Sequence, residues 1–289
     1  MICAEKYYDY KKLTEDIFTL QEEYPLLQVS SAGRSVHGRE LWYMTVGSGE
    51  LTLLAVGAHH AREYITSVLL MKLCEDLLRN YDSALMERTR VAILPMLNPD
   101  GVEICLYGDC GNEYIASLPR LNGTYSSWKA NGRGVDLNRN YPCLWEQKSV
   151  IADLPSSEMY NGPYAASEPE VRAMMALSRR LSPALALTFH AKGEEIYYAD
   201  SNTLRLDADS FAYAKAISCL SGYRILPPSS DPAIYAAGFE NWFRAEIGAP
   251  CILIEAGKYD GTEPFTIERF GTEIWEKLKN ILREMLFMF

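Results

Sequence analysis

Residues 51–63 read LTLLAVGAHHARE, in which a short apolar run leads closely into two histidines, an arginine and a glutamate. An apolar run without regular polar alternation is typical of a strand that is buried on both faces. We interpret residues 90–95, 184–189 and 251–254 in the same way. The four segments predict a largely parallel sheet at the centre of the fold.

Helical patterns alternate with these strands along the chain. Leu13, Ile17 and Leu20 stand at helical spacing and predict an amphipathic helix over residues 7–24. Further helices are expected over residues 67–78, 168–181, 207–220 and 267–289. Strands that alternate with helices imply an α/β fold in which helices cover both faces of the sheet.

The composition excludes several classes of protein. The chain has 289 residues, of which 48% are hydrophobic and 23% are charged, as is common in globular domains and not in disordered or fibrous chains. The net charge of -10 argues against a sequence-independent nucleic-acid binder. The longest apolar runs are far shorter than the roughly 18 residues that a membrane span requires. Residues 1–10 lack the apolar core of a signal peptide.

The seven cysteines are scattered and form no CxxC motif, so the sequence carries no zinc ribbon or thioredoxin-type motif. This usage indicates reduced thiols in a protein of the cytoplasm. Cys105 and Cys110 are close enough in sequence to close a loop, and the spacing leaves that alternative open. We expect a cytoplasmic protein that binds neither nucleic acid nor membrane.

Chemically reactive side chains stand at the ends of three predicted strands. His60 closely follows the first apolar run, His190 follows residues 184–189, and Glu255 follows residues 251–254. Ligands of open α/β sheets collect at the carboxyl ends of the strands. A carboxylate directly after an apolar strand is costly to bury unless it is paired or lies at a cleft. These positions predict a functional site at this edge of the sheet.

His60 and Glu63 are three residues apart at a turn between a predicted strand and a predicted helix, so both can point to one location. Zinc binds histidine nitrogen and carboxylate oxygen, and a catalytic zinc has three protein ligands and a water. His190 would complete this set, and His59 is the competing ligand. The alternative is an ordinary helix N-terminus with an acidic residue in its first turn.

Residues 128–141 read WKANGRGVDLNRNY and lie within a long irregular stretch, residues 98–163. Such a stretch inside a compact domain is usually functional. Asn138 and Arg139 stand side by side and can bind one carboxylate, because arginine is a planar, fork-shaped donor. A polar turn explains the asparagines and glycines, but it does not explain Asp136, Asn138 and Arg139 together with the two histidines at the strand ends.

The ordered series of motifs resembles the zinc carboxypeptidases of the M14 peptidase family. The motifs are HARE at 60–63, NPDG at 98–101, GVDLNRN at 134–140, His190, IY at 234–235 and IE at 254–255. The resemblance extends from about residue 7 to residue 265. It implies a single catalytic domain over residues 1–289, an α/β/α sandwich with a mixed, largely parallel twisted sheet. It also implies a zinc metallopeptidase with one zinc ion per chain.

Within this family the chain is more similar to the bacterial γ-D-glutamyl-L-diamino acid peptidases. WKAN at 128–131 and HAKGE at 190–194 carry this likeness, and digestive-type members have an arginine where Lys129 stands. The branch cleaves the bond between γ-D-glutamate and diaminopimelate in murein peptides, which would make such a peptide the partner of this chain. The alternatives are a general zinc carboxypeptidase acting on L-peptides, and an inactive peptide-binding member, which would be expected to lack a ligand or the base.

The resemblance also implies roles in catalysis. The zinc ligands would be His60, Glu63 and His190. Glu255 would act as general base, with a buried ion-pair partner as its alternative. Asp136 would hold the first zinc histidine, unless it only caps a turn, and Lys129 would stabilise the oxyanion, unless it is a solvated lysine.

A second group of residues would bind the substrate. By resemblance, Asn138, Arg139 and Tyr235 would bind the free carboxylate of the leaving residue. Arg62 would contact the acyl side of the substrate, unless it is simply solvated. Glu240 lies near the region that shapes the leaving-group pocket, where it would face the second ammonium of diaminopimelate. A solvated glutamate at a helix start is the alternative for Glu240.

Overall fold

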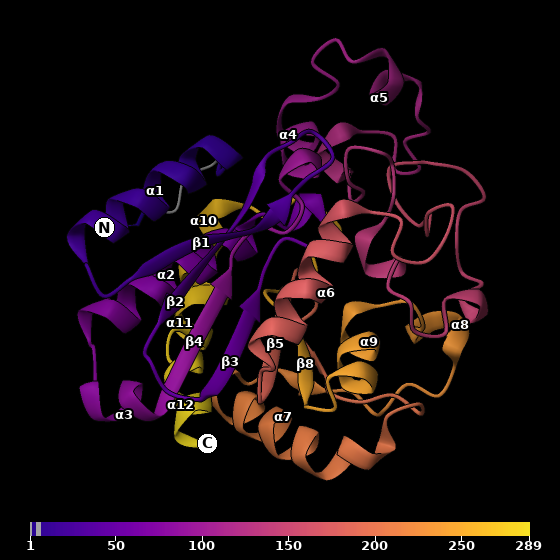
Figure 1. Ribbon diagram of the computed structural model, residues 1–289. Helices are drawn as coiled ribbons and strands as arrows, with labels where there is room; N and C mark the ends of the chain where they lie inside the picture. Colours follow the sequence, from indigo (N-terminus) through magenta and orange to yellow (C-terminus); the bar gives the residue numbers. More distant parts are fainter. Residues whose placement is uncertain (1, 4–6) are drawn as a thin grey trace.

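The computed structural model describes residues 2–3 and 7–289, and eight of its strands form one sheet in the order β1-β2-β4-β3-β5-β8-β6-β7. The centre of the sheet consists of the four predicted strands, which run parallel: β4 (Thr89–Leu94), β3 (Leu51–Val56), β5 (Leu185–His190) and β8 (Cys251–Glu255). Helices lie on both faces of this sheet (Figure 1). The predicted α/β fold with a mixed, largely parallel sheet is confirmed.

The strands at the two edges of the sheet were not predicted. β1 (Gln28–Arg34) and β2 (Glu40–Val46) form an antiparallel pair beside β4. β6 (Glu195–Tyr197) is antiparallel to β8, and β7 (Arg224–Ile225) is parallel to β6. No residue of β1 is buried, and β7 has only two residues, so neither strand carries an apolar run in its sequence.

Four of the expected helices are present: α1 (Tyr10–Glu23), α2 (Ile65–Arg79), α6 (Pro169–Leu181) and α7 (Asp207–Ser221). The expected continuous helix over residues 267–289 is wrong, because that segment is divided. It consists of α10 (Ile267–Phe270), the short π-helix η6 (Gly271–Trp275), α11 (Glu276–Leu278) and α12 (Ile281–Phe287).

Several short helices were not predicted: α3 (Ser83–Arg88), α4 (Pro99–Tyr107), α5 (Glu113–Ser117), α8 (Pro232–Tyr235) and α9 (Phe239–Glu246). The irregular stretches also contain the 3-10 helices η2 (Tyr125–Ser127), η3 (Leu137–Arg139), η4 (Trp145–Gln147) and η5 (Leu204–Leu206). The NPDG motif at 98–101 begins α4. Asn98 caps this helix by accepting a hydrogen bond from the Gly101 amide at 3.0 Å, and Pro99 occupies its first turn.

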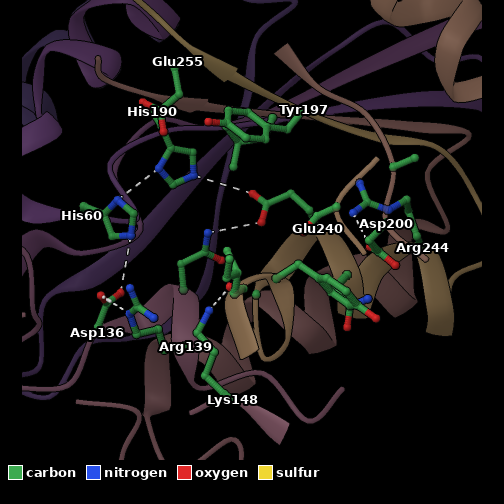
Figure 2. Close-up of a pocket in the computed structure, with 18 of the residues that line it drawn as sticks. His60, Asp136, Arg139, Lys148, His190, Tyr197, Asp200, Glu240, Arg244 and Glu255 are labelled. Atoms are coloured by element: carbon green, nitrogen blue, oxygen red, sulfur yellow. Dashed lines mark hydrogen bonds and ion pairs between the residues drawn. The ribbon is translucent and has the colours of Figure 1, made fainter. Parts of the chain in front are cut away.

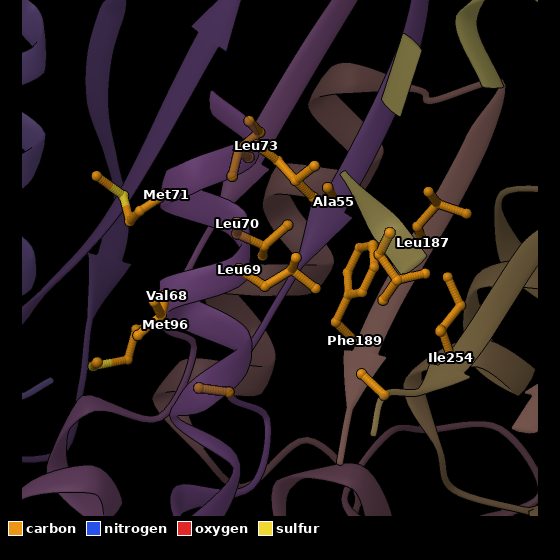
Figure 3. Packing of buried hydrophobic residues seen from close by; sticks show 14 of the residues in the cluster. Ala55, Val68, Leu69, Leu70, Met71, Leu73, Met96, Leu187, Phe189 and Ile254 are labelled. Atoms are coloured by element: carbon orange, nitrogen blue, oxygen red, sulfur yellow. The ribbon is translucent and has the colours of Figure 1, made fainter. Parts of the chain in front are cut away.

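Alternate residues of the central strands pack into two separate hydrophobic clusters, because successive side chains point to opposite faces of a sheet. On one face, Ala55, Leu187 and Phe189 contribute to the cluster that includes α2 (Figure 3). On the other face, Leu54 and Val56 belong to the cluster of α6 and α9. Burial on both sides explains why these strands read as continuous apolar runs.

The structure also shows the state of Cys105 and Cys110 and the lengths of the apolar helices. Cys105 and Cys110 are both free thiols, and the Cys105 thiol donates to the Ser126 carbonyl at 3.2 Å. The loop closure between them is therefore not formed. Among the residues described, no helix has both the length and the apolar character that crossing a membrane requires.

Candidate metal centre and substrate cleft

The parallel strands bring the reactive residues to one edge of the sheet. His190 and Glu255 are the last residues of β5 and β8 and face each other in register. His60 and Glu63 follow β3, which pairs with β5, and Glu63 ends the short 3-10 helix η1 (Ala61–Glu63). Three strand ends separated by up to 195 positions in the numbering thus meet at one location.

Two histidines and one carboxylate converge there, and we call His60, Glu63 and His190 the triad. The Nδ1 atoms of His60 and His190 lie 3.1 Å apart, and the two Glu63 oxygens lie 2.8 Å and 2.9 Å from them. All three side chains are buried. The two Nδ1 atoms are too close for both to carry a proton that points at the other. One ligand atom from each residue lies within 4.8 Å of the others, so the three could hold one metal ion.

Zinc fits this donor set. Two atoms bound tetrahedrally at about 2.1 Å from one zinc ion are about 3.4 Å apart, close to the separations of the triad. The triad also follows the usual composition of a catalytic site, with three nitrogen or oxygen ligands from the protein. His59, the competing ligand, is directed elsewhere: its Nε2 lies 3.3 Å from the Tyr141 hydroxyl and its ring packs against Phe239.

The far nitrogen of each triad histidine faces a further carboxylate (Figure 2). The Nε2 of His60 lies 3.4 Å from Asp136, and the Nε2 of His190 lies 3.6 Å from Glu240. Carboxylates in such positions fix the tautomer and orientation of a metal-binding histidine. Asp136 was expected here from the sequence, whereas the contact between Glu240 and His190 was not.

Asp136 is fully buried and stays ionised. Burial alone would raise the pKa of its carboxyl, but Lys129, His60 and Arg139 together hold this pKa well below its usual range. Its oxygens lie 3.6 Å from Lys129 Nζ and 3.0 Å from Arg139 Nε. Asp136 thus holds Lys129 beside the triad. A residue that only capped a turn would not make these contacts with Lys129, His60 and Arg139.

Glu240 lies in the first turn of α9 and is only 7% exposed, so its interpretation as a solvated glutamate is wrong. Its carboxylate accepts hydrogen bonds from the Thr188 hydroxyl at 2.6 Å and the Asn138 amide at 3.2 Å. Burial would raise the pKa of Glu240, but its contacts with His190 and Thr188 lower it. Glu240 therefore presents a negative charge inside the site.

Glu255 lies beside the triad without an ion pair within 4 Å among the residues described, so the ion-pair interpretation finds no support. Desolvation, and next the negative charge of Glu63, raises the pKa of Glu255 to about 8. A positive metal ion held by the triad would offset the charge of Glu63 and lower this pKa again.

A cleft of about 260 Å³ opens in front of the triad. It is lined by nine of the residues singled out from the sequence: His60, Lys129, Asp136, Asn138, Arg139, His190, Tyr235, Glu240 and Glu255. The Tyr235 hydroxyl lies 3.0 Å from Ser201 Oγ. The structure thus brings the residues assigned to metal binding, catalysis and carboxylate binding to one space.

Arg62 does not line this cleft. Its guanidinium forms an ion pair with Glu158 at 3.0 Å and donates to the Ser127 carbonyl at 3.1 Å, with Glu263 3.9 Å away. It is therefore held by protein groups and is not simply solvated. The cleft also contains Ile234 of the IY motif, together with residues that the sequence did not single out, namely Lys148, Tyr197, Ala199, Asp200, Ser229, Gly238, Asn241, Arg244 and Leu253.

Comparisons with known proteins agree with this geometry. Residues 13–221 match the family Peptidase_M14, described as zinc carboxypeptidase. The chain is 29% identical to the "Gamma-D-glutamyl-L-diamino acid endopeptidase 1" of Lysinibacillus sphaericus, over 96% of this chain and 72% of that protein. It is 32% identical to the uncharacterized protein YqgT of Bacillus subtilis (strain 168), over 99% of this chain and 79% of that protein.

Solved structures share the fold. Bovine thrombin-activatable fibrinolysis inhibitor superposes with a TM-score of 0.77 at 19% identity, over 99% of this chain and 98% of that chain. Carboxypeptidase A from Helicoverpa armigera gives a TM-score of 0.74 at 24% identity, over 98% of this chain and 75% of that chain.

Proposed function

This chain belongs to the M14 family of zinc carboxypeptidases, and from that premise we propose that it hydrolyses the amide bond between γ-D-glutamate and diaminopimelate in murein peptides. Membership makes the chain a zinc metallopeptidase with a peptide substrate. The substrate is the proposed part. Its support is the similarity, over 96% of this chain, to the L. sphaericus enzyme, whose name describes a γ-D-glutamyl-L-diamino acid endopeptidase.

The observation that carries the proposal is the buried carboxylate of Glu240 in the cleft. A leaving residue with an ordinary apolar side chain would leave this charge facing an apolar group, which is costly. Diaminopimelate carries a second ammonium that can pair with it. A carboxylate has about four acceptor positions, so the bonds from Thr188 and Asn138 and the contact with His190 leave one for this ammonium.

The residues around the triad are placed for hydrolysis of an amide. When bound, zinc polarises the scissile carbonyl and lowers the pKa of a coordinated water toward 7. Glu255 accepts a proton from the attacking water and passes it to the leaving nitrogen. The Lys129 ammonium, held 3.6 Å from Asp136, stabilises the negative charge that develops on the carbonyl oxygen. Asp136 in turn orients His60.

The leaving residue is held by its proximal carboxylate, next to the scissile amide. Arg139 donates from Nε to Asp136 at 3.0 Å and from Nη1 to the Val150 carbonyl at 2.7 Å. These two bonds fix the guanidinium and leave its other N–H groups for a carboxylate. Asn138 is fixed as well, because its Oδ1 accepts from the Phe239 amide at 2.7 Å.

Three peptides that differ either in the glutamyl residue or in the leaving residue test the substrate. L-Ala-γ-D-Glu-meso-diaminopimelate should be cleaved with a kcat/KM at least about tenfold higher than its α-L-glutamyl isomer, the scale on which one charge-assisted contact acts. L-Ala-γ-D-Glu-L-Ala should also be a poor substrate, because alanine offers no ammonium for the remaining acceptor position of Glu240. If the α-linked isomer is the better substrate, the general carboxypeptidase is the correct assignment.

Amidation of the proximal carboxylate should lower kcat/KM by roughly ten- to a hundredfold in the wild type, because Arg139 then faces a neutral group. The penalty should shrink in Arg139→Ala, since the two changes remove the same interaction. Kinetics of both enzymes on both peptides measure this coupling. Arg133→Ala is the control, because that arginine pairs with Glu168 at 3.8 Å outside the cleft and should keep the full penalty. An equal penalty in Arg139→Ala would contradict the contact.

A further inference from the structure

Lys148 is a lysine of the cleft wall that lies outside every motif of the sequence analysis. It follows η4 and is only 7% exposed. Its side chain lines the same cleft as Arg139 and Glu240, and Figure 2 shows it extending toward the cleft beside Arg139. A nearly buried ammonium that reaches a substrate cleft is a candidate for binding an anion.

In the part of the chain that the structure describes, the ammonium of Lys148 has no carboxylate partner. The ammonium donates to the Ile234 carbonyl, and within residues 2–3 and 7–289 no carboxylate lies within 4 Å of it. Burial, and next the positive charge of Arg139, lowers the pKa of Lys148 to about 8, while the negative charges of Asp136 and Asp231 oppose this shift. Because a buried charge without a counter-ion is costly, an anionic ligand would complete this position.

The other charges of the cleft already have partners or assignments. Arg244 donates to Asp200 at 2.6 Å and to the Cys251 carbonyl at 2.6 Å, so this pair is neutral as a unit. Arg139 is fixed by Asp136 and faces the proximal carboxylate. Lys148 is thus a cation of the cleft to which the proposed reaction has so far given no role.

We propose that Lys148 binds the distal carboxylate of diaminopimelate, at the far end of the leaving residue. The inference rests on the proposed function and specifies which leaving residue the cleft accepts. The distal carbon of diaminopimelate carries an ammonium and a carboxylate together. The cleft offers a residue of opposite charge for each of these groups: Glu240 for the ammonium and Lys148 for the carboxylate. The enzyme therefore selects a leaving residue with a second anionic group.

The test compares L-Ala-γ-D-Glu-meso-diaminopimelate with the same peptide amidated at its distal carboxylate, using zinc-loaded enzyme. Wild type should prefer the free acid by about ten- to a hundredfold in kcat/KM, mainly through KM. Lys148→Met, which keeps the length and removes the charge, should lose most of this preference and cleave the amidated peptide about as well as wild type. Lys215→Met, on the exposed side of α7, is the matched control and should keep the preference.

The outcomes separate the two proposals. If wild type cleaves both γ-D-glutamyl peptides equally well, or if folded Lys148→Met keeps the full preference, the role of Lys148 is refuted while the proposed function stands. If neither peptide is cleaved and an α-L-linked peptide is, the proposed function is refuted and this inference with it. The wild-type comparison needs no variant, so it decides the question even where Lys148→Met does not fold.

Discussion

Replacing His190 by alanine is expected to abolish stoichiometric zinc binding. Purified wild type should hold about one zinc per chain, as a site with three protein ligands requires. The variant loses the Nδ1 that lies 3.1 Å from His60 and 2.9 Å from Glu63. Loss of a contact outside the ligand set already weakens metal affinity by about ten- to a hundredfold, so loss of a ligand should exceed a hundredfold. Metal analysis after dialysis measures the zinc content.

His59→Ala is the matched control for this experiment. The two rings stack with centroids 5.6 Å apart, but the His59 ring is directed at Tyr141 instead of the triad. Burial lowers the pKa of His59 to about 3, so its removal takes away no positive charge at neutral pH. This variant should keep about one zinc per chain. Stoichiometric zinc in folded His190→Ala would refute the ligand assignment.

The centre of the sheet could be predicted from the sequence because its strands are buried on both faces. All six residues of β5 are buried, and its first three residues, Leu185, Ala186 and Leu187, form a continuous apolar run. An edge strand is subject to no such requirement. In β1 only intermediate and exposed positions occur, and its sequence, QVSSAGR, has the composition of a loop. Pairing with β2 is decided by tertiary contacts that no local pattern contains.

The C-terminal segment shows a different limit. Helical periodicity reports which positions are buried, and Ile274, Leu278, Ile281 and Met285 are indeed buried on the core side. The same spacing is kept when the helix contains a π-turn and an interruption, because the apolar side still faces the core. Periodicity therefore located the buried face correctly and could not locate the break between α11 and α12.

The residues of the candidate site also differ in how far local sequence patterns determine their positions. His60, His190 and Glu255 could be singled out because each stands at the end of an apolar strand, where topology alone brings them to one edge. Lys148 could not, since its position depends on how an irregular loop folds against the Ile234 carbonyl, 86 residues further along the chain. The contact of Glu240 with His190 has the same cause, because α9 was not predicted.

Replacing Glu255 by glutamine is expected to lower kcat by at least about a hundredfold, the lower end of what a positioned general base contributes. Glutamine keeps the shape of the side chain and cannot accept the proton of the attacking water. Because Glu255 is not one of the three triad residues, zinc content should stay at about one per chain. Steady-state kinetics on the γ-D-glutamyl-diaminopimelate peptide and metal analysis of the same sample measure the two quantities.

Glu195→Gln tests whether any nearby carboxylate would give this result. Glu195 stands directly opposite Glu255 in the register of β6 and β8, and its carboxylate forms an ion pair with Arg224 outside the cleft lining. Its loss removes a negative charge next to Glu255 without removing a proton acceptor from the cleft, so kcat should remain near the wild-type value. A zinc-loaded Glu255→Gln enzyme with near-normal kcat would exclude Glu255 as the base. Equal losses in both variants would instead indicate that the local charge, and not proton transfer by Glu255, determines the rate.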